Sequence, residues 1–344
     1  MRKVSAYFLI LITSISFSAA QDIHFTQFYA APLEMNPANT GLFNGNIRGV
    51  INYRNQWQSF APYNTFAGSV DYNFGQNFLE NDLIGVGVSF ISDVAGDAEF
   101  STTQGNISVS YIKTLGNKFS RNYLSAGFYG GLAQRTINTA NMTFGSQYNG
   151  YSYDPNITSG ETIAFNDFSF VDLGGGVNWL FVPEDRFNVY SGVAFHHVNQ
   201  PNQSFGSVNE NLYMRITGTL GAQIPISEKV DMVPGILTQV QGPHYEFMGG
   251  LNFKYYMQTR ASNETAFSIG AWHRMGIDNE LGYKSDASAI AFRYDFLGLS
   301  AGLSYDINIS GLRDASNSLG GPELSLIYTA ALPHRDRKVD CPKF

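Results

Sequence analysis

The chain has 344 residues and a formal net charge of −7, and only 14% of its residues are charged, well below the roughly 25% usual in globular proteins. Glycine occurs 35 times, tyrosine 20 times and phenylalanine 27 times, whereas cysteine occurs once. The acidic balance argues against a nucleic-acid partner, which would need a basic surface. A single cysteine excludes an internal disulfide framework. Low charge with many glycines and aromatic residues favours a sheet with one face in an environment other than water.

Residues 1–20 have the pattern of a secretory signal peptide. Arg2 and Lys3 precede an apolar run, and small residues follow it up to Ala20. We therefore expect cleavage after Ala20. The run is too short for a retained membrane helix, which needs about 20 apolar residues, and Cys341 stands too far from the amino terminus to serve as a lipoprotein anchor.

The mature chain of about 324 residues shows strand signals almost throughout. Period-two alternation of apolar and polar residues, interrupted by turn residues, recurs between residues 46 and 332. It predicts about 14 strands, at 46–57, 64–74, 82–92, 101–114, 122–138, 166–182, 187–197, 211–224, 229–239, 244–258, 266–275, 287–296, 298–307 and 321–332. Most of these reach the roughly 9–11 residues that a tilted strand needs to cross a bilayer.

The two faces of each predicted strand differ in polarity. In the eighth strand, one face carries Arg215 and Thr217, whereas the other carries Ile216 and Leu220. Apolar side chains toward lipid and polar side chains toward an interior are typical of a transmembrane β-barrel. A soluble β-sandwich would show the same period, but the strand lengths and the low charge favour an all-β outer-membrane barrel of antiparallel strands.

Loop lengths provide a second indication. If the first strand starts in the periplasm, the odd-numbered connections lie outside the cell and should be long. The long connections 139–165, 198–210, 276–286 and 308–320 are odd-numbered, whereas the short ones 183–186, 225–228 and 297–298 are even-numbered. The odd-numbered connections 58–63 and 240–243 are short exceptions. An even strand count then predicts that both termini lie in the periplasm.

Short motifs at both ends of the mature chain indicate one family. They are QDIHFTQF (21–28), PLEMNPANTG (32–41), YRNQW (53–57) with YNT (63–65) and SVD (69–71), GPELSLIY (321–328) and a closing CPKF (341–344). In these motifs the chain resembles the PorP/SprF family of type IX secretion system membrane proteins from the Bacteroidetes, and it is closer to the SprF-like branch. The middle of the chain, residues 100–290, carries no specific motif of this kind.

The resemblance implies a barrel that works with the type IX export machinery and its cargo, including the large surface adhesin of gliding bacteria. SprF-like members pair with cargo that bears a distinct C-terminal targeting domain, and PorP-like members associate with periplasmic components of the machinery. The expected partners are therefore a large secreted surface protein, periplasmic or lipoprotein components of the machinery, and outer-membrane lipid. A small-solute porin or transporter is the alternative function.

Residues with catalytic or metal-binding chemistry form no recognisable pattern. His196 and His197 are adjacent, and adjacent side chains of a strand point to opposite faces, so the pair would not share a metal ion. The acidic loops 93–97 and 154–160 lack the ligand spacing of a calcium loop. The glycine run 174–176 leads into further strand rather than a helix, and such glycines let a bulky neighbour approach a sheet. We expect no enzyme activity, no cofactor and no metal.

Charged residues on the polar faces of the predicted strands are the candidate site residues. They are Arg48, Arg54, Arg215, Glu246, Lys254, Arg274, Arg293 and Asp295. Two interpretations stay open. These side chains pair with one another and stiffen a filled barrel, or they hold a plug or a segment of a partner in the lumen.

The two ends of the mature chain lie outside the predicted strands. The candidate plug residues of the first end are Phe25, Phe28, Tyr29, Leu33 and Met35, and we expect them to pack inside or beneath a barrel wide enough to hold them. The other end is basic, and its candidate periplasmic docking residues are Arg335, Arg337, Lys338 and Lys343; a solvated terminus is the alternative. The chain thus divides into a signal peptide (1–20), a periplasmic or plug-like N-terminal segment (21–45), a transmembrane barrel (46–332) and a periplasmic tail (333–344).

Overall fold

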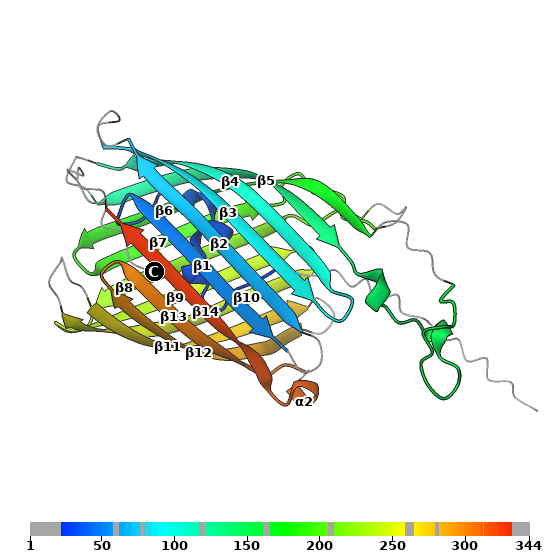
Figure 1. The fold of residues 1–344 in the computed structure, drawn as a ribbon. Coiled ribbons are helices and arrows are strands. Elements are labelled where there is room, and N and C mark those ends of the chain that lie inside the picture. The colour runs from blue at the N-terminus through cyan, green and yellow to red at the C-terminus, as the bar shows by residue number, and fades with distance from the viewer. Residues whose placement is uncertain are drawn as a thin grey trace, which may run out of the picture.

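The computed structural model describes residues 22–57, 62–75, 79, 81–116, 121–160, 166–205, 210–258, 265–278, 282–311 and 313–331. Within them the strands are β1 (Ile47–Gln56), β2 (Tyr63–Phe74), β3 (Leu83–Ala95), β4 (Phe100–Thr114), β5 (Asn122–Thr136), β6 (Asp167–Glu184), β7 (Phe187–His196), β8 (Arg215–Pro225), β9 (Val230–Gln241), β10 (His244–Gln258), β11 (Thr265–Asp278), β12 (Gly282–Phe296), β13 (Leu299–Asn308) and β14 (Leu319–Ala330). Each strand pairs with its chain neighbours and β1 also pairs with β14, so the sheet closes into a barrel (Figure 1). The predicted signal peptide and C-terminal tail lie outside the described residues.

The prediction of a closed antiparallel barrel with 14 strands is confirmed. The strands are 10 to 18 residues long, enough to cross a bilayer at the usual tilt. One boundary differs clearly, because β12 begins at Gly282 rather than near residue 287. Tyr283 and Lys284 are exposed and pair with β11, so backbone hydrogen bonding continues past the point where the alternation of polarity ends.

Side chains alternate between the barrel interior and its outer surface. Along β13, Ser300 and Ser304 are buried, whereas Leu299 and Leu303 are 44% and 46% exposed. Many Leu, Ile, Val and aromatic side chains of other strands are exposed on the same outer face. Such a surface is compatible with the acyl chains of a bilayer rather than with water.

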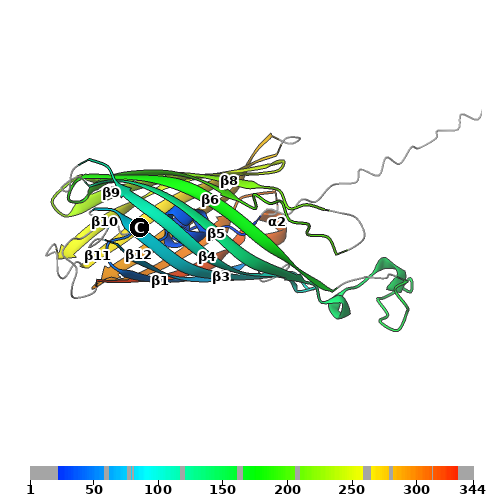
Figure 2. The same cartoon turned by 90° about the horizontal axis from the view of Figure 1, so that it is seen from above.

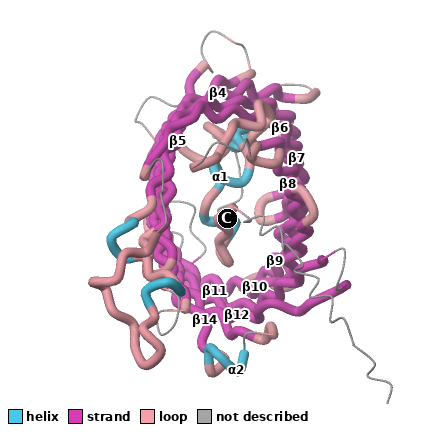
Figure 3. Tube along the Cα trace, turned by 90° about the vertical axis from the view of Figure 1, so that its right-hand side faces the viewer, coloured by secondary structure: helices cyan, strands magenta, loops and turns pink. Residues whose placement is uncertain are grey.

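Short helices lie before β1 and in two connections. They are η1 (Phe28–Ala30), α1 (Pro32–Met35) and η2 (Pro37–Asn39), then η3 (Thr139–Asn141) and η4 (Gly145–Gln147), and finally α2 (Arg313–Ser316). Viewed along the barrel, α1 lies within the ring of strands (Figure 3). In the described part of the chain, helices of the length and apolarity needed to span a membrane are absent.

The N-terminal segment, residues 22–46, crosses the lumen from one rim of the barrel to the other. We name the rims after the strand connections that they carry, the odd rim with β1–β2 and the even rim with β2–β3. The amide of Asp22 donates to the side chain of Gln241, the last residue of β9, at the odd rim (3.0 Å). The amide of Asn46 donates to the carbonyl of Ala330, the last residue of β14, at the even rim (2.7 Å).

This path separates the two described ends of the chain, whereas the sequence led us to expect both ends of the mature chain in the periplasm. Fourteen strands return Ala330 to the rim at which β1 begins, but the pass through the lumen adds one further crossing before β1. Asp22 and Ala330 therefore lie at opposite rims. The physical reason is that the apolar side chains of the segment are buried along the lumen, so the segment spans it instead of hanging below it.

An epitope tag inserted between Ala20 and Asp22 should therefore be accessible from the same side of the membrane as a tag in the 139–160 connection. A tag in the turn at 226–229, which lies at the even rim, should be accessible from the other side. Antibody binding to intact and to opened cells measures both. If the tag before Asp22 were accessible from the same side as the 226–229 tag, passage of the N-terminal segment through the lumen would be contradicted.

Candidate functional site

The lumen with its N-terminal segment is the candidate site, because the segment packs against the inner wall on several sides. Of the candidate plug residues, Phe25, Phe28, Leu33 and Met35 are buried and Tyr29 is partly buried. Phe28 meets the ring of Trp272 on β11 edge-on, with ring centroids 5.3 Å apart. Phe25 packs with side chains of β2 and β3 on the other side of the segment. Closure of the lumen by this segment stays a prediction.

Wall side chains supply hydrogen-bond partners for the backbone of the segment. A buried backbone without long helices or strands needs such partners. Glu323 of β14 accepts from the amides of Thr26 and Gln27, both at 2.8 Å. Further wall contacts are Asn52 to the carbonyl of Ala30, Ser125 to the carbonyl of Ala38, Ser110 to the carbonyl of Thr40, Asp71 to the amide of Gly41, and Asn73 to the carbonyls of Gly41 and Gly45. The wall therefore determines the path of the segment.

Glycines of the wall let this backbone come close. A Cβ atom at Gly127 of β5 would overlap the carbonyl group of Pro37. A Cβ atom at Gly176, in the glycine run of β6, would overlap the side chain of Asn36, which donates to the carbonyl of Val177 (3.0 Å). The glycine run thus lies within a strand and makes room for a neighbour.

The structure places all the predicted charged lumen residues inside the barrel. The pairs are Arg48 with Asp71, Arg54 with Asp306 and Glu323, Arg215 with Asp22, Lys254 and Arg293 with Asp295, Arg274 with Asp286 and Asp306, and Glu246 with His24. The side chains of these arginines and of the lysine are at most 10% exposed. Some pairs lie within the wall, and those of Arg215 and Glu246 reach the segment. Contact of any of them with a partner protein stays a proposal.

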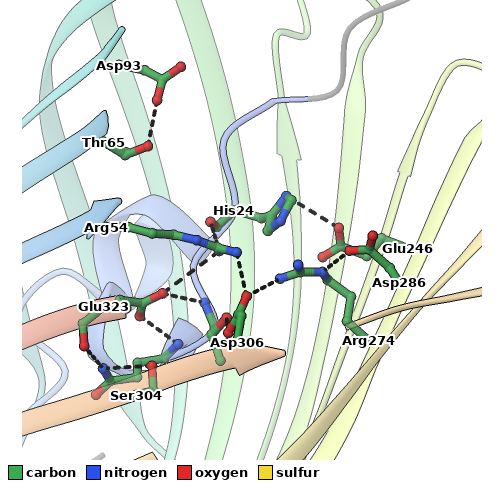
Figure 4. Close-up of polar contacts among 12 residues, drawn as sticks. His24, Arg54, Thr65, Asp93, Glu246, Arg274, Asp286, Ser304, Asp306 and Glu323 are labelled. Carbon is green, nitrogen blue, oxygen red and sulfur yellow. Dashed lines mark hydrogen bonds and ion pairs between the residues drawn. The ribbon is translucent and has the colours of Figure 1, made fainter. Parts of the chain in front are cut away.

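Figure 4 shows the network around Asp306 of β13, where the start of the segment meets the wall. Arg54 donates to the carbonyl of His24 (2.5 Å) and to Asp306 (2.7 Å). Asp306 also accepts from the hydroxyl of Thr26 (2.6 Å) and lies 3.3 Å from Arg274. Arg54, Arg274 and Asp306 therefore compensate one another's charges, and removal of Asp306 would leave both arginines short of a counter-charge.

A second polar cluster, the rim clasp, holds the odd-rim end of the segment. It consists of Asp22, Asp172, His197 and Arg215. His197 lies between the two carboxylates, with Nε2 2.6 Å from Asp22 and Nδ1 2.8 Å from Asp172, and Arg215 lies 3.3 Å from Asp22. Burial alone would lower the pKa of His197, but the carboxylates of Asp22 and Asp172 outweigh it and raise the pKa to about 9. At neutral pH His197 is thus a cation between two carboxylates, and Arg215 adds a second positive charge beside Asp22.

The prediction that His196 and His197 face opposite sides is wrong. β7 ends at His196, and His197 has a φ of +56° that turns the chain out of the strand. Both side chains are consequently buried, with ring centroids 6.3 Å apart. Strand alternation applies only while the strand continues. Among the residues that the structure describes, three or more His, Cys, Asp or Glu side chains do not gather in a metal-binding group.

Sequence reasoning missed most of the wall residues that hold the segment, namely Asp71, Asp172, His197, Asp306 and Glu323. A signal was present for Asp71 and Glu323, because both stand in the terminal motifs that carry the family resemblance. The remaining three lie outside these motifs. The predicted docking residues Arg335, Arg337, Lys338 and Lys343 are outside the described part of the chain.

The fold and this site define a class of protein, a membrane β-barrel whose lumen contains its own N-terminal segment. The chain matches the family described as type IX secretion system membrane protein PorP/SprF over residues 17–328, and it belongs to this family. The match does not separate the branches within the family. No curated protein matches the chain in sequence. The family, described as a membrane protein of a secretion system, and the closed barrel with its apolar outer face together place the protein in the outer membrane.

Solved barrels are similar in fold at low sequence identity. The CymD monoaromatic hydrocarbon channel is 11% identical, with a TM-score of 0.49 over 92% of this chain and 95% of the channel. The Ralstonia pickettii toluene transporter TbuX is 8% identical, with a TM-score of 0.46 over 87% of this chain and 92% of the transporter. The TodX monoaromatic hydrocarbon channel, as a deltaS2 mutant, is 10% identical, with a TM-score of 0.44 over 87% and 93%.

Replacing Gly127 by valine should destabilise the barrel, because the new side chain would overlap the backbone of the segment at Pro37. Overpacking of this kind costs about 1–3 kcal/mol. Gly105→Val is the matched control, since a Cβ atom at Gly105 of β4 meets nothing within 4 Å. Urea unfolding in lipid vesicles, followed by heat-modified gel mobility, measures the difference. Equal stability of the two variants would contradict the close approach.

The rim clasp should loosen as the pH rises through about 9. The pKa of His197 is raised in the folded protein, so its contribution to stability is fully present below the ordinary histidine value of about 6.5 and is lost as the pH passes the raised value. Proteolysis near Asp22 should therefore be faster at pH 10 than at pH 7. His197→Gln should show the faster cleavage at both values. Equal cleavage of the unmodified protein at both pH values would count against the clasp.

Proposed function

We propose that this chain is a non-enzymatic barrel of the type IX secretion system that binds, delivers or anchors a secreted cargo, such as a gliding adhesin, at the cell surface. In this role it also contacts periplasmic components of the export machinery. Membership of the PorP/SprF family supports the secretion role. We favour a partner-binding barrel over a small-solute porin because the N-terminal segment lies in the lumen.

The lumen is better suited to rigidity than to solute passage. The segment is held by Glu323 and Asp71 of the wall and by the rim clasp. A cavity beside it, lined by residues that include Arg215 and Glu246, has a volume of about 10 Å³. Another, lined by residues that include Tyr29, has about 30 Å³. Cavities of this size hold about one or a few waters, which supports a filled barrel.

The two rims suit different partners under this proposal. Outer-membrane barrels have long loops outside the cell and short turns in the periplasm. The odd rim carries the long β5–β6 and β7–β8 connections, and the even rim carries short turns such as the one between Glu184 and Phe187. We therefore assign the odd rim, with Asp22, to the cell surface and the even rim, with Ala330, to the periplasm.

The basic tail, residues 333–344, follows Ala330 at the proposed periplasmic rim. Its residues Arg335, Arg337, Lys338 and Lys343 give it a charge opposite to that of an acidic partner. Opposite charges raise the rate of encounter and make binding sensitive to salt. We propose that this tail docks a periplasmic or lipoprotein component of the machinery.

Copurification from native membranes tests the proposal most directly. The tagged full-length barrel should retain a large exported protein and at least one periplasmic component, and a strain without the barrel should leave that exported protein undelivered. A variant without residues 333–344 should keep the exported protein and lose the periplasmic component. The small-solute alternative predicts instead steady ion conductance in planar bilayers and no retained protein. That pair of results would overturn the proposed function.

A further inference from the structure

The connection between β5 and β6 stands away from the barrel as a separate arm, residues 139–160. Figures 1 and 2 show it beyond the odd rim, clear of the wall. It contains the short helices η3 and η4. A connection of this length in a compact protein is usually functional when it is ordered.

The arm has its own framework of hydrogen bonds. The amide of Asp154 donates to the carbonyl of Gln147 (2.9 Å), and the Gln147 side chain donates to the carbonyl of Ile157 (3.0 Å). The amides of Tyr151 and Ser152 both donate to the side chain of Asn149, at 3.0 and 2.9 Å. Gln147 is only 8% exposed, although the arm stands alone. The arm is therefore a preformed hairpin rather than an extended loop.

This framework presents three tyrosines to the outside. Tyr151 at the tip is 96% exposed, and Tyr148 and Tyr153, which face each other in a β-bridge, are 58% and 44% exposed. Tyr, Ser, Gly and Asn make up more than half of the arm, and Asp154 is its single charged residue. Binding loops of antibodies have the same composition, because tyrosine supplies a large contact area at low entropic cost while Ser, Gly and Asn adapt their hydrogen bonds.

The root of the arm is rigid and adjoins a hollow. Phe168 on β6 packs edge-on against Phe205 of the β7–β8 connection, with ring centroids 4.7 Å apart, and Arg135 of β5 lies over the ring of Phe170. The hollow, of about 460 Å³, is lined by Val94, Glu99, Ser101, Thr136, Ile137 and Asn138. Because residues 137 and 138 lead directly into the arm, hollow and arm form one continuous surface.

We infer that the arm and this hollow form the docking surface for a folded protein exported by the same secretion system. The identity of the partner as an exported protein rests on the function proposed above. The tyrosines would insert into the partner as anchors, and the hollow would receive a side chain or turn of it. The near absence of charge in the arm favours a protein surface matched by shape and aromatic contact over a charged polysaccharide. Preformed loops bind more tightly because less order is lost on binding.

The test compares two variants of the full-length barrel in native membranes. In the arm variant, Tyr148, Tyr151 and Tyr153 are all changed to alanine. The control is Tyr283→Ala, since Tyr283 is 82% exposed at the odd rim on β12 but lies outside the arm. Aromatic anchors at the centre of an interface commonly carry most of its affinity. The amount of exported protein that the arm variant retains should therefore fall at least about tenfold below that of the unmodified barrel. The control should retain as much as the unmodified barrel.

A photo-crosslinking side chain gives a second measurement that does not depend on the triple variant folding. Placed at Tyr151, it should crosslink to an exported protein, whereas at Tyr283 it should not. The docking role of the arm would be overturned if the arm variant retained as much exported protein as the unmodified barrel. It would also be overturned if position 151 crosslinked to surface polysaccharide alone. In both cases the proposed function would stand. If the unmodified barrel itself retained no exported protein, both the docking role of the arm and the proposed function would be overturned.

Discussion

A backbone that crosses a membrane barrel with only short helical turns must find most of its hydrogen-bond partners in the wall, because little water is available there. The N-terminal segment meets this constraint through polar wall side chains, two of which, Asp71 and Glu323, also pair with arginines of the wall. Glu323 accepts hydrogen bonds from two amides of the segment, and Asp71 accepts one from a third. Asn52 donates a hydrogen bond to one carbonyl of the segment. The polar interior of the barrel is thus organised around one particular chain path. Apart from the closing CPKF (341–344), the motifs in which this sequence resembles the family lie in the segment and in the strands β1, β2 and β14, which contact one another.

The same constraint decides how the chain is placed across the membrane. A segment anchored from the Asn73 contacts at one end to the rim clasp at the other spans the lumen, so Asp22 and Ala330 lie at opposite rims. The barrel closes between β1 and β14, and the segment lies inside that closed ring.

The strands were predictable and the contacts of the segment were not, for a physical reason. A strand between lipid and a polar interior alternates apolar and polar side chains every two residues. Strands such as β8 and β13 can therefore be predicted from their own sequence. The hydrogen bond between Thr26 and Glu323 joins residues 297 positions apart, and no local pattern records such a pairing. Burial of Phe25 and Phe28 followed from their apolarity, but the direction of the segment through the lumen did not. His197 escaped prediction because its positive φ ends the alternation on which the argument depended.

Hydrogen–deuterium exchange of the barrel in lipid tests the central claim, that the wall holds the N-terminal segment as firmly as it holds its own strands. The amides of Thr26, Gln27 and Gly41, which donate to Glu323 and Asp71, should exchange as slowly as amides in the middle of β1. Exchange of these three amides at the rate of an exposed loop such as 139–160 would contradict the account.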